Sequence, residues 1–320
     1  MTASTQAQVQ ATGQAQPQKR RRELSDRAIV NLFIWPTLVL LIAWNFFPLI
    51  YSLYLSFTDY SAIANKPPQW IGFENYADIL TDPQMWKYFA TTGRYALVTV
   101  GMQTILGFSL AVLVREKFKG SGLVTTLILI PMMLSPVVVG LFWKLMYNPS
   151  FGFFNYFLGF ESAVGAPDML AGRFANVPVP NLALWAVAIV DIWMWTPFVM
   201  LLVLSGLKAI PDYLYEAAII DRASSWFQFW RITVPSVMPL LMIAILFRTI
   251  EAFKSFDLVM GMTGGGPGDQ TELIAVNLYR QAFLGQWRTG RASALAYLIL
   301  IVIIAISNLY IRYINKANED

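Results

Sequence analysis

Repeated apolar runs of about 20 residues constrain this chain more than any other feature of its sequence. A helix of that length crosses the ~30 Å hydrocarbon core of a bilayer. The chain has 320 residues, of which 57% are hydrophobic and 13% are charged. An average soluble domain has about a quarter of its residues charged. The sequence therefore predicts an all-α integral membrane protein.

Six transmembrane helices are expected from these runs. They cover residues 28–56, 88–114, 123–147, 182–204, 232–253 and 292–313. Basic residues gather at alternate ends, in residues 19–27, in residues 115–120 and at Arg312 and Lys316. Because positively charged loops remain in the cytoplasm, both termini are expected to be cytoplasmic. The first run is span-length and has no small-residue cleavage site, so we expect an uncleaved helix rather than a signal peptide.

Four parts follow from this arrangement. Residues 1–27 are a basic cytoplasmic tail, whose first 18 residues have the polar composition of a disordered segment. Residues 28–87 hold the first transmembrane helix and an external loop. The core transmembrane domain covers residues 88–314 and contains a polar insert at 211–235. Residues 315–320 are expected to form a cytoplasmic C-terminal tail.

Several kinds of chemistry are excluded by composition. The chain contains no cysteine and no histidine, which removes disulfides, thiol nucleophiles, Cys or His metal sites and imidazole acid–base catalysis. Its net charge of +4 comes from residues that flank the apolar runs, so a nucleic-acid partner is not expected. We therefore expect no catalytic residues, no metal and no cofactor.

A glycine-rich run, TGGGPG at residues 263–268, invites comparison with a phosphate-binding loop. The Walker pattern requires Gly-Lys-Ser/Thr, with the lysine reaching the phosphates. Pro267 and Asp269 stand in the corresponding stretch. The run therefore predicts a tight turn after the fifth transmembrane helix.

The polar insert reads YEAAIIDRASSWFQFWRITVP at residues 215–235. Asp212 and Glu216 suit the positive end of a helix dipole, and Ser224-Ser225 can end that helix and cap a second one at 226–233. One interpretation is an amphipathic helix on the bilayer surface, which favours a broad apolar face edged by Lys and Arg. The acids and alanines of the insert instead favour docking to a protein.

The insert resembles the EAA loop of ABC importer permeases, whose pattern is E-A-A, three residues, G, nine residues, I, one residue, L-P. Glu216, Ala217 and Ala218 match the first three positions, and Ile232 matches the isoleucine. Arg222 replaces the glycine, and valine replaces leucine before Pro235. Glycine favours a turn with positive φ. Either the turn here is of an ordinary type, or Arg222 itself contacts the ATPase.

Other segments extend the resemblance over most of residues 57–313. FTDYS, WIGFENYADIL, GLKAIPDYLYEAA and TGGGPGDQTELIAVNLYRQAF resemble sugar-type permeases of the maltose and glycerol-phosphate importer group. The resemblance implies a type I ABC importer permease fold in the bacterial inner membrane. It also implies a second homologous permease, two ABC ATPase subunits and an extracytoplasmic solute-binding protein. ATP hydrolysis would belong to the ATPase subunits, so the chain itself is not expected to be an enzyme. The implied coupling residues are Glu216, Ala217, Ala218, Asp221 and Arg222.

Charged side chains inside the apolar runs are candidates for the substrate path, since each costs about 3 kcal/mol in lipid. By resemblance, the segments VDIWMWTPF and FRTIEAFKSFD line a site for a carbohydrate-like solute near the middle of the membrane. The candidate residues are Asp191, Trp195, Thr196, Arg248, Glu251 and Lys254. The two cations leave room for an anionic solute. The alternative is that Arg248–Glu251 and Lys254–Asp257 are neutralising pairs that hold the helices together.

Two functional alternatives remain. An ion-driven secondary transporter could use Asp191 or Glu251 as a proton carrier. A membrane enzyme would need a convergent cluster of reactive residues, and the sequence shows none. An EAA loop has no use in a secondary transporter. Pro131 and Pro136, inside the third run, permit kinks that serve either a moving gate or simple helix packing.

Overall fold

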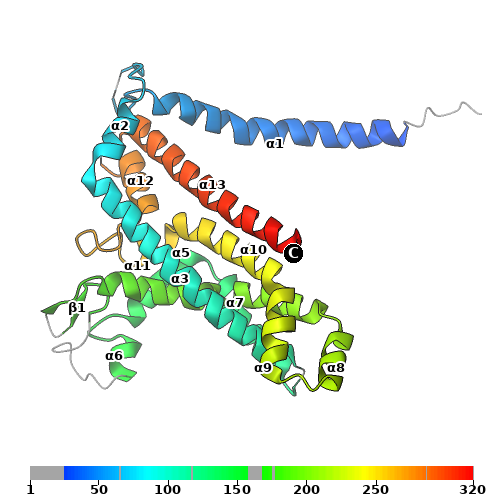
Figure 1. The fold of residues 1–320 in the computed structure, drawn as a ribbon. Helices are drawn as coiled ribbons and strands as arrows, with labels where there is room; N and C mark the ends of the chain where they lie inside the picture. The colour runs from blue at the N-terminus through cyan, green and yellow to red at the C-terminus, as the bar shows by residue number, and fades with distance from the viewer. Residues whose placement is uncertain are drawn as a thin grey trace, which may run out of the picture. The chain divides into compact units, whose positions relative to one another are not determined.

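Helices form almost all of the structure, a computed structural model that describes residues 25–64, 66–116, 118–157, 168–174, 177–285 and 287–319 (Figure 1). The segment predicted to be disordered, residues 1–18, lies outside these residues, as do residues 19–24. Two compact units make up the chain, residues 1–51 and residues 52–320. Most of helix α1 (Asp26–Ser56) lies in the first unit, and this helix contains Pro36 and Pro48. Its Phe47 and Tyr51 rings stack at 6.2 Å.

Five helical segments of the described chain are long and apolar enough to cross a membrane. Besides α1, they are α3 (Pro83–Arg115), α7 (Leu182–Ala209), a segment that ends with α10 (Val234–Phe253), and α13 (Thr289–Glu319). Asp82 caps α3 by accepting a hydrogen bond from the backbone N–H of Gln84 at 2.9 Å. These helices confirm five of the six predicted runs. Helix α13 continues to Glu319, beyond the end of the sixth apolar run.

The third predicted run is broken. Helix α4 (Ser121–Leu129) and the 3₁₀ turn η1 (Ile130–Met133) meet α5 (Pro136–Met146) at a bend of 97°. Leu134 and Ser135 adopt extended backbone between them. A proline lacks an N–H and disfavours helical backbone in the residue before it, so Pro136 ends the run at Ser135. The run expected at 123–147 is therefore bent next to Pro136, one of the two prolines that permit a kink, and the crossing count reaches six when the bent pair is counted as one span.

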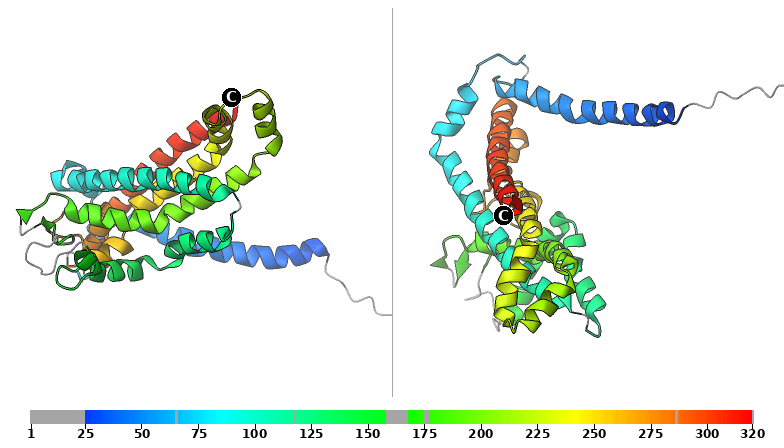
Figure 2. Two further views of the ribbon diagram at one scale, coloured as in Figure 1. Left: turned by 90° about the horizontal axis from the view of Figure 1, so that it is seen from below. Right: turned by 45° about the vertical axis from the view of Figure 1, so that its right-hand side comes forward.

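Close packing at glycine positions holds the second unit together. Figure 2 shows α3 and α7 side by side. A Cβ added to Gly107 of α3 would lie 2.7 Å from the Cβ of Val199 in α7. Gly140 of α5 meets Gly261 of α11 (Asp257–Met262) in the same way, since an added Cβ would lie 3.0 Å from the Leu258 carbonyl. Small residues at such contacts let backbones approach, which is the usual basis of helix association in lipid.

Short elements occupy the ends of the long helices. They are α2 (Glu74–Thr81), α6 (Phe153–Phe157), the antiparallel strands β1 (Arg173–Phe174) and β2 (Val177–Pro178), α8 (Asp212–Ile220), α9 (Ser225–Gln228), the π-helical turn η2 (Phe229–Thr233) and α12 (Ile274–Phe283). The glycine-rich run forms the predicted turn. Gly264, Gly265 and Gly268 have φ of 60°, 95° and 61°, which side chains other than glycine rarely adopt.

Candidate functional site

A buried polar network joins three transmembrane helices. Arg248 of α10 forms an ion pair with Asp191 of α7, with Nη2 and Oδ2 3.1 Å apart. Gln103 of α3 completes the network. Its Oε1 accepts from Arg248 Nε at 2.9 Å, and its Nε2 donates to Asp191 Oδ2 at 2.9 Å. The three residues are at most 3% exposed. The network therefore ties α3, α7 and α10 at one level.

The Arg248 guanidinium has a further partner in an aromatic ring. Its Cζ lies 4.7 Å from the centroid of the Trp195 ring, in cation–π geometry. A second hydrogen bond from Gln103 Nε2 reaches the Asp191 carbonyl at 3.0 Å. A buried charge is tolerable when it is paired and hydrogen-bonded in this way, whereas removal of one partner costs about 3–5 kcal/mol.

The alternative that Arg248–Glu251 and Lys254–Asp257 form neutralising pairs along the fifth transmembrane helix was wrong. Arg248 pairs with Asp191 of another helix, and Lys254 pairs with Glu251 at 2.9 Å. Arg248 faces the core, but Glu251 is exposed. Helix α10 ends at Phe253 and α11 begins at Asp257, so the helical spacing that suggested a Lys254–Asp257 pair does not continue.

Five of the six candidate path residues border one small cavity of about 80 Å³. Asp191, Trp195 and Arg248 border it from the buried network, and Glu251 and Lys254 border it from the end of α10. The other lining residues are Pro136, Ser255, Phe256, Asp257 and Leu258. Sites for small ligands usually measure about 300–1,000 Å³. This cavity is therefore too small to be a complete ligand site.

Thr196 lies apart from this cavity. Its side chain is buried, and its hydroxyl donates to the Ile192 carbonyl of its own helix at 2.6 Å. This hydroxyl is therefore bonded to the backbone of α7 and does not contact the charged residues. The resemblance alone had suggested it as a path residue.

Gln103 and Tyr95 belong to the network region and were missed by sequence reasoning. Both are fully buried, and the Tyr95 hydroxyl lies 3.4 Å from Ser255 Oγ. The sequence does contain an indication of Gln103, because a glutamine in the middle of an apolar run commonly joins helices within a membrane.

Helix α8 has a surface of both charged and apolar side chains. It precedes the start of α10, whereas the small cavity lies near the end of α10. Glu216 and Ala217 are exposed, and Ile219 and Ile220 are 65% and 81% exposed. Ala218 points inward and is 9% exposed. The exposed part of the predicted coupling segment therefore combines a carboxylate, a small residue and two large apolar side chains. The isoleucines were the part that sequence reasoning overlooked.

Contacts from α8 to the transmembrane helices fix its position. The Tyr215 hydroxyl accepts a hydrogen bond from Arg115 Nη1 at 3.0 Å and lies 2.9 Å from Thr233 Oγ1. The Arg115 guanidinium also stacks over the Tyr215 ring, with Cζ 4.6 Å from its centroid. These contacts connect α8 to the end of α3 and to η2.

Arg222 ends α8 with left-handed backbone at φ 55°. The N–H of Ala223 donates to the Ala218 carbonyl at 2.8 Å, and the N–H of Arg222 donates to the Ile219 carbonyl at 3.0 Å. This pair of bonds is the Schellman motif, which glycine usually closes. The suggestion of an ordinary turn was wrong. Asp221, which precedes it, is exposed, as is Arg222 itself.

The glycine-rich turn is held by a second buried carboxylate. Glu272 is 2% exposed, and its Oε2 lies 3.4 Å from Arg280 Nη2. Arg280 also donates to the Gly264 carbonyl. Burial raises the pKa of the Glu272 carboxyl, and the nearby Arg280 opposes this only in part.

A further ion pair joins this turn to the start of α3. Asp269 accepts hydrogen bonds from Lys87 Nζ at 2.6 Å and from Gln84 Nε2 at 2.7 Å. The hydrogen bond from Lys87 lowers the pKa of the Asp269 carboxyl. The turn is thus held by two ion pairs, one to Arg280 of α12 and one to Lys87 of α3.

Comparison with known proteins gives a consistent picture. Residues 103–319 match the family described as binding-protein-dependent transport system inner membrane component. The chain is 34% identical over 282 residues to the trehalose/maltose transport system permease protein MalF of Thermococcus litoralis, covering 88% of this chain and 92% of that protein. It is 32% identical over 297 residues to the sulfoquinovosyl glycerol transport system permease protein SmoG of Agrobacterium fabrum, covering 91% and 92%.

Solved structures share the fold. A chain from the crystal structure of a bacterial ABC transporter involved in the import of the acidic polysaccharide alginate matches with a TM-score of 0.75. The identity is 19%, and the match covers 90% of this chain and 95% of that one. A second match, with a TM-score of 0.73 and 20% identity, covers 88% and 92% and comes from the alginate transporter in complex with a periplasmic protein bound to alginate pentasaccharide.

Proposed function

The chain belongs to the family of binding-protein-dependent transport system inner membrane components, and from this premise we propose its specific role. It is a permease of an ABC importer with several membrane-crossing helices. We propose that it pairs with a second homologous permease to form the path for a sugar, polyol or related solute. Relatives named for trehalose/maltose and for sulfoquinovosyl glycerol support a carbohydrate as the solute.

One observation carries the coupling part of the proposal. Helix α8 is bound to the transmembrane helices through Tyr215, while Glu216, Ile219 and Ile220 are exposed on it. Exposed apolar side chains beside a carboxylate form a surface suited to a protein partner. In this proposal two cytoplasmic ABC ATPase subunits supply the force, and α8 of this chain docks into one of them. Ala217, Asp221 and Arg222 border the same surface, whereas Ala218 supports it from within.

The substrate path is proposed at the small cavity beside the buried network. Trp195 offers an aromatic ring, and Glu251 and Lys254 offer groups that hydrogen-bond to hydroxyls. The second permease would supply the remaining wall, because this chain alone encloses only about 80 Å³ there. Arg248 and Lys254 allow for an anionic group on the solute. An extracytoplasmic solute-binding protein would deliver it.

Charge reversal at Glu216 tests the coupling role. We expect Glu216→Lys to abolish solute-stimulated ATP hydrolysis and uptake in reconstituted vesicles, while the chain still inserts into the membrane. Glu74→Lys, a reversal at an exposed acid of α2, controls for the effect of the charge change on insertion. Full stimulated hydrolysis and uptake by Glu216→Lys would contradict the proposal. Ala218→Asp is a poorer test, because it would place a charge inside the chain.

A further inference from the structure

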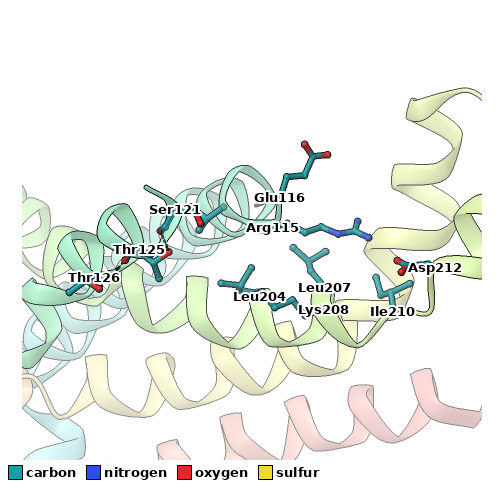
Figure 3. Close-up of a pocket in the computed structure, with 12 residues that line it drawn as sticks. Arg115, Glu116, Ser121, Thr125, Thr126, Leu204, Leu207, Lys208, Ile210 and Asp212 are labelled. Carbon is teal, nitrogen blue, oxygen red and sulfur yellow. Dashed lines mark hydrogen bonds between the residues drawn. The ribbon is translucent and has the colours of Figure 1, made fainter. Parts of the chain in front are cut away.

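A cavity of about 800 Å³ lies where α3, α4, α7 and α8 meet (Figure 3). Figure 3 shows hydroxyl side chains of α4 on one side, Arg115 and Asp212 on the other, and leucines of α7 between them. The lining residues are Val114, Arg115, Glu116, Ser121, Gly122, Thr125, Thr126, Leu204, Leu207, Lys208, Ile210 and Asp212. The cavity is about ten times as large as the one beside the buried network.

The cavity lies at the level where transmembrane helices end. Arg115 is the last residue of α3, Lys208 lies in the last turn of α7, and Ser121 begins α4. Basic residues at the ends of such helices lie among the lipid headgroups. The molecules present in bulk at this depth are therefore phospholipids.

Four charged side chains line the cavity without ion pairs. Arg115, Glu116, Lys208 and Asp212 make no ion pair within 4.0 Å anywhere in the part of the chain that the structure describes. Among the described residues, the Arg115 guanidinium makes one hydrogen bond, from Nη1 to the Tyr215 hydroxyl, which leaves most of its donors available. The lining offers two cations and two anions. Its charge therefore complements a ligand that carries one group of each sign.

The hydroxyl groups and the apolar wall add to this complementarity. Thr125 and Thr126 donate to carbonyls of their own helix at 2.8 and 2.9 Å, so their oxygens remain as acceptors for a ligand donor. Leu204, Leu207 and Val114 supply an apolar wall beside the charges. A ligand with a charged end and an apolar end fits both parts.

We propose that this cavity binds the headgroup of a phospholipid that carries a phosphate and a primary ammonium group. Arg115 and Lys208 bind the phosphate through charge-assisted hydrogen bonds. Asp212, on the same side of the cavity as Arg115, accepts from the ammonium, and the leucines contact the glycerol region. Because Asp212 begins α8, the bound lipid braces the start of this helix.

Lipid retention by the delipidated transporter complex tests this assignment. The complex, in detergent, is mixed with phosphatidylethanolamine, phosphatidylcholine or phosphatidylglycerol, and bound lipid is counted by native mass spectrometry. We expect preferential retention of phosphatidylethanolamine, because choline has no N–H donor and glycerol has no positive charge. Lys208→Gln and Asp212→Asn should each weaken retention about tenfold, as loss of one charge-assisted bond predicts. Lys144→Gln, at an exposed lysine of α5, should leave it unchanged.

Three results would overturn the proposal. Equal retention of the three lipids would contradict the assignment of a phosphate and ammonium headgroup. Retention unaffected by Lys208→Gln and Asp212→Asn would show that the lipid does not bind in this cavity. Soluble glycerophosphoethanolamine that binds as tightly as the lipid would show that the ligand is a soluble phosphate ester. Equal melting temperatures of wild type and variants, measured without lipid, would confirm that the variants are folded. A variant with a lower melting temperature is replaced by Lys208→Ala or Asp212→Ser.

Discussion

Arg222 holds a backbone conformation that glycine adopts at lower free energy. A side chain with Cβ in the left-handed region costs about 1 kcal/mol relative to glycine. The Schellman bonds from Ala223 and Arg222 keep the turn in place despite this cost. Strained backbone that persists on an exposed segment is a reason to look for a function of the side chain. For Arg222, an acidic group on the ATPase is the partner that its charge would suit.

Two substitutions separate the backbone of Arg222 from its side chain. Arg222→Gly should raise the free energy of unfolding by about 1 kcal/mol, because it relieves the strain, whereas Arg222→Ala should not. Both should lower solute-stimulated ATP hydrolysis if the guanidinium contacts the ATPase. Thermal unfolding of the complex and its ATPase rate measure the two effects. Undiminished ATPase activity in both variants would rule out a contact through the side chain.

The Asp191–Arg248 pair predicts a contrast between single and double substitution. Asp191→Ala should destabilise the chain by about 3–5 kcal/mol, because Arg248 would remain charged and buried. Asp191→Leu combined with Arg248→Met should recover most of that loss, since apolar residues of similar volume can replace a buried pair. Unfolding in detergent measures both variants.

Uptake by the double variant then separates the two roles of the pair. Restored stability with impaired uptake would place the pair in the substrate path. Restored stability with normal uptake would limit the pair to holding the helices together. A single variant as stable as wild type would contradict the cost expected from the buried geometry.

At the level of elements, the glycine-rich turn offers a matched pair of substitutions. Gly264 and Gly265 both have positive φ, but only Gly265 faces a side chain. A Cβ added there would overlap Glu272 Oε2, while the space around Gly264 is open. Gly264→Ala should cost about 1–2 kcal/mol from its backbone alone. Gly265→Ala should cost clearly more, and equal losses in thermal unfolding would contradict the packing described.

The two carboxylates of this turn should respond to pH in opposite directions. The pKa of Glu272 is raised by burial, so its contribution to stability is present below the ordinary glutamate pKa of about 4.3 and is lost as pH rises through the raised value. The pKa of Asp269 is lowered by its bond from Lys87. Its contribution is present above the ordinary aspartate pKa of about 3.9 and is lost as pH falls through the lowered value.

Amide substitutions should remove each dependence separately. Glu272→Gln imitates the protonated acid, so stability of the turn should no longer fall as pH rises. Asp269→Asn should instead remove the loss on acidification. Hydrogen exchange at residues 263–272 as a function of pH reports both effects. A pH profile of Glu272→Gln that matches wild type would show that the Glu272 carboxyl does not titrate in this range.

Helical segments could be predicted where apolar length alone decides them. The runs at 88–114 and 182–204 became α3 and α7, with ends that differ by a few residues. The run at 123–147 contains the same kind of residues, yet Pro136 separates α4 from α5, and Gly140 of α5 packs against Gly261 of α11. Hydropathy does not report bends, because a bent pair and a straight helix bury the same composition in lipid.

For the whole molecule, orientation in the membrane is the central prediction. Both termini and α8 should face the cytoplasm, as the distribution of basic residues requires. The natural absence of cysteine allows single cysteines to be introduced without background. A membrane-impermeant maleimide applied to intact spheroplasts should label Ala64→Cys. It should label Ser225→Cys and Arg312→Cys only after the membrane is permeabilised. Labelling of Ser225→Cys in intact spheroplasts would reverse the orientation.

By itself, the sequence determined that the chain lies in a membrane, where its crossings fall and which segment carries the EAA-type pattern. Those properties depend on hydrophobicity and spacing along the chain, and both can be read locally. The tertiary structure decided that Arg248 pairs with Asp191 and that Gln103 bonds to both, that Ala218 faces inward, and that four charged side chains, with no ion pair among the described residues, line one cavity. These properties depend on which faces of distant helices meet. Hydrophobic periodicity leaves that choice open, because every helix in lipid is apolar on most of its circumference.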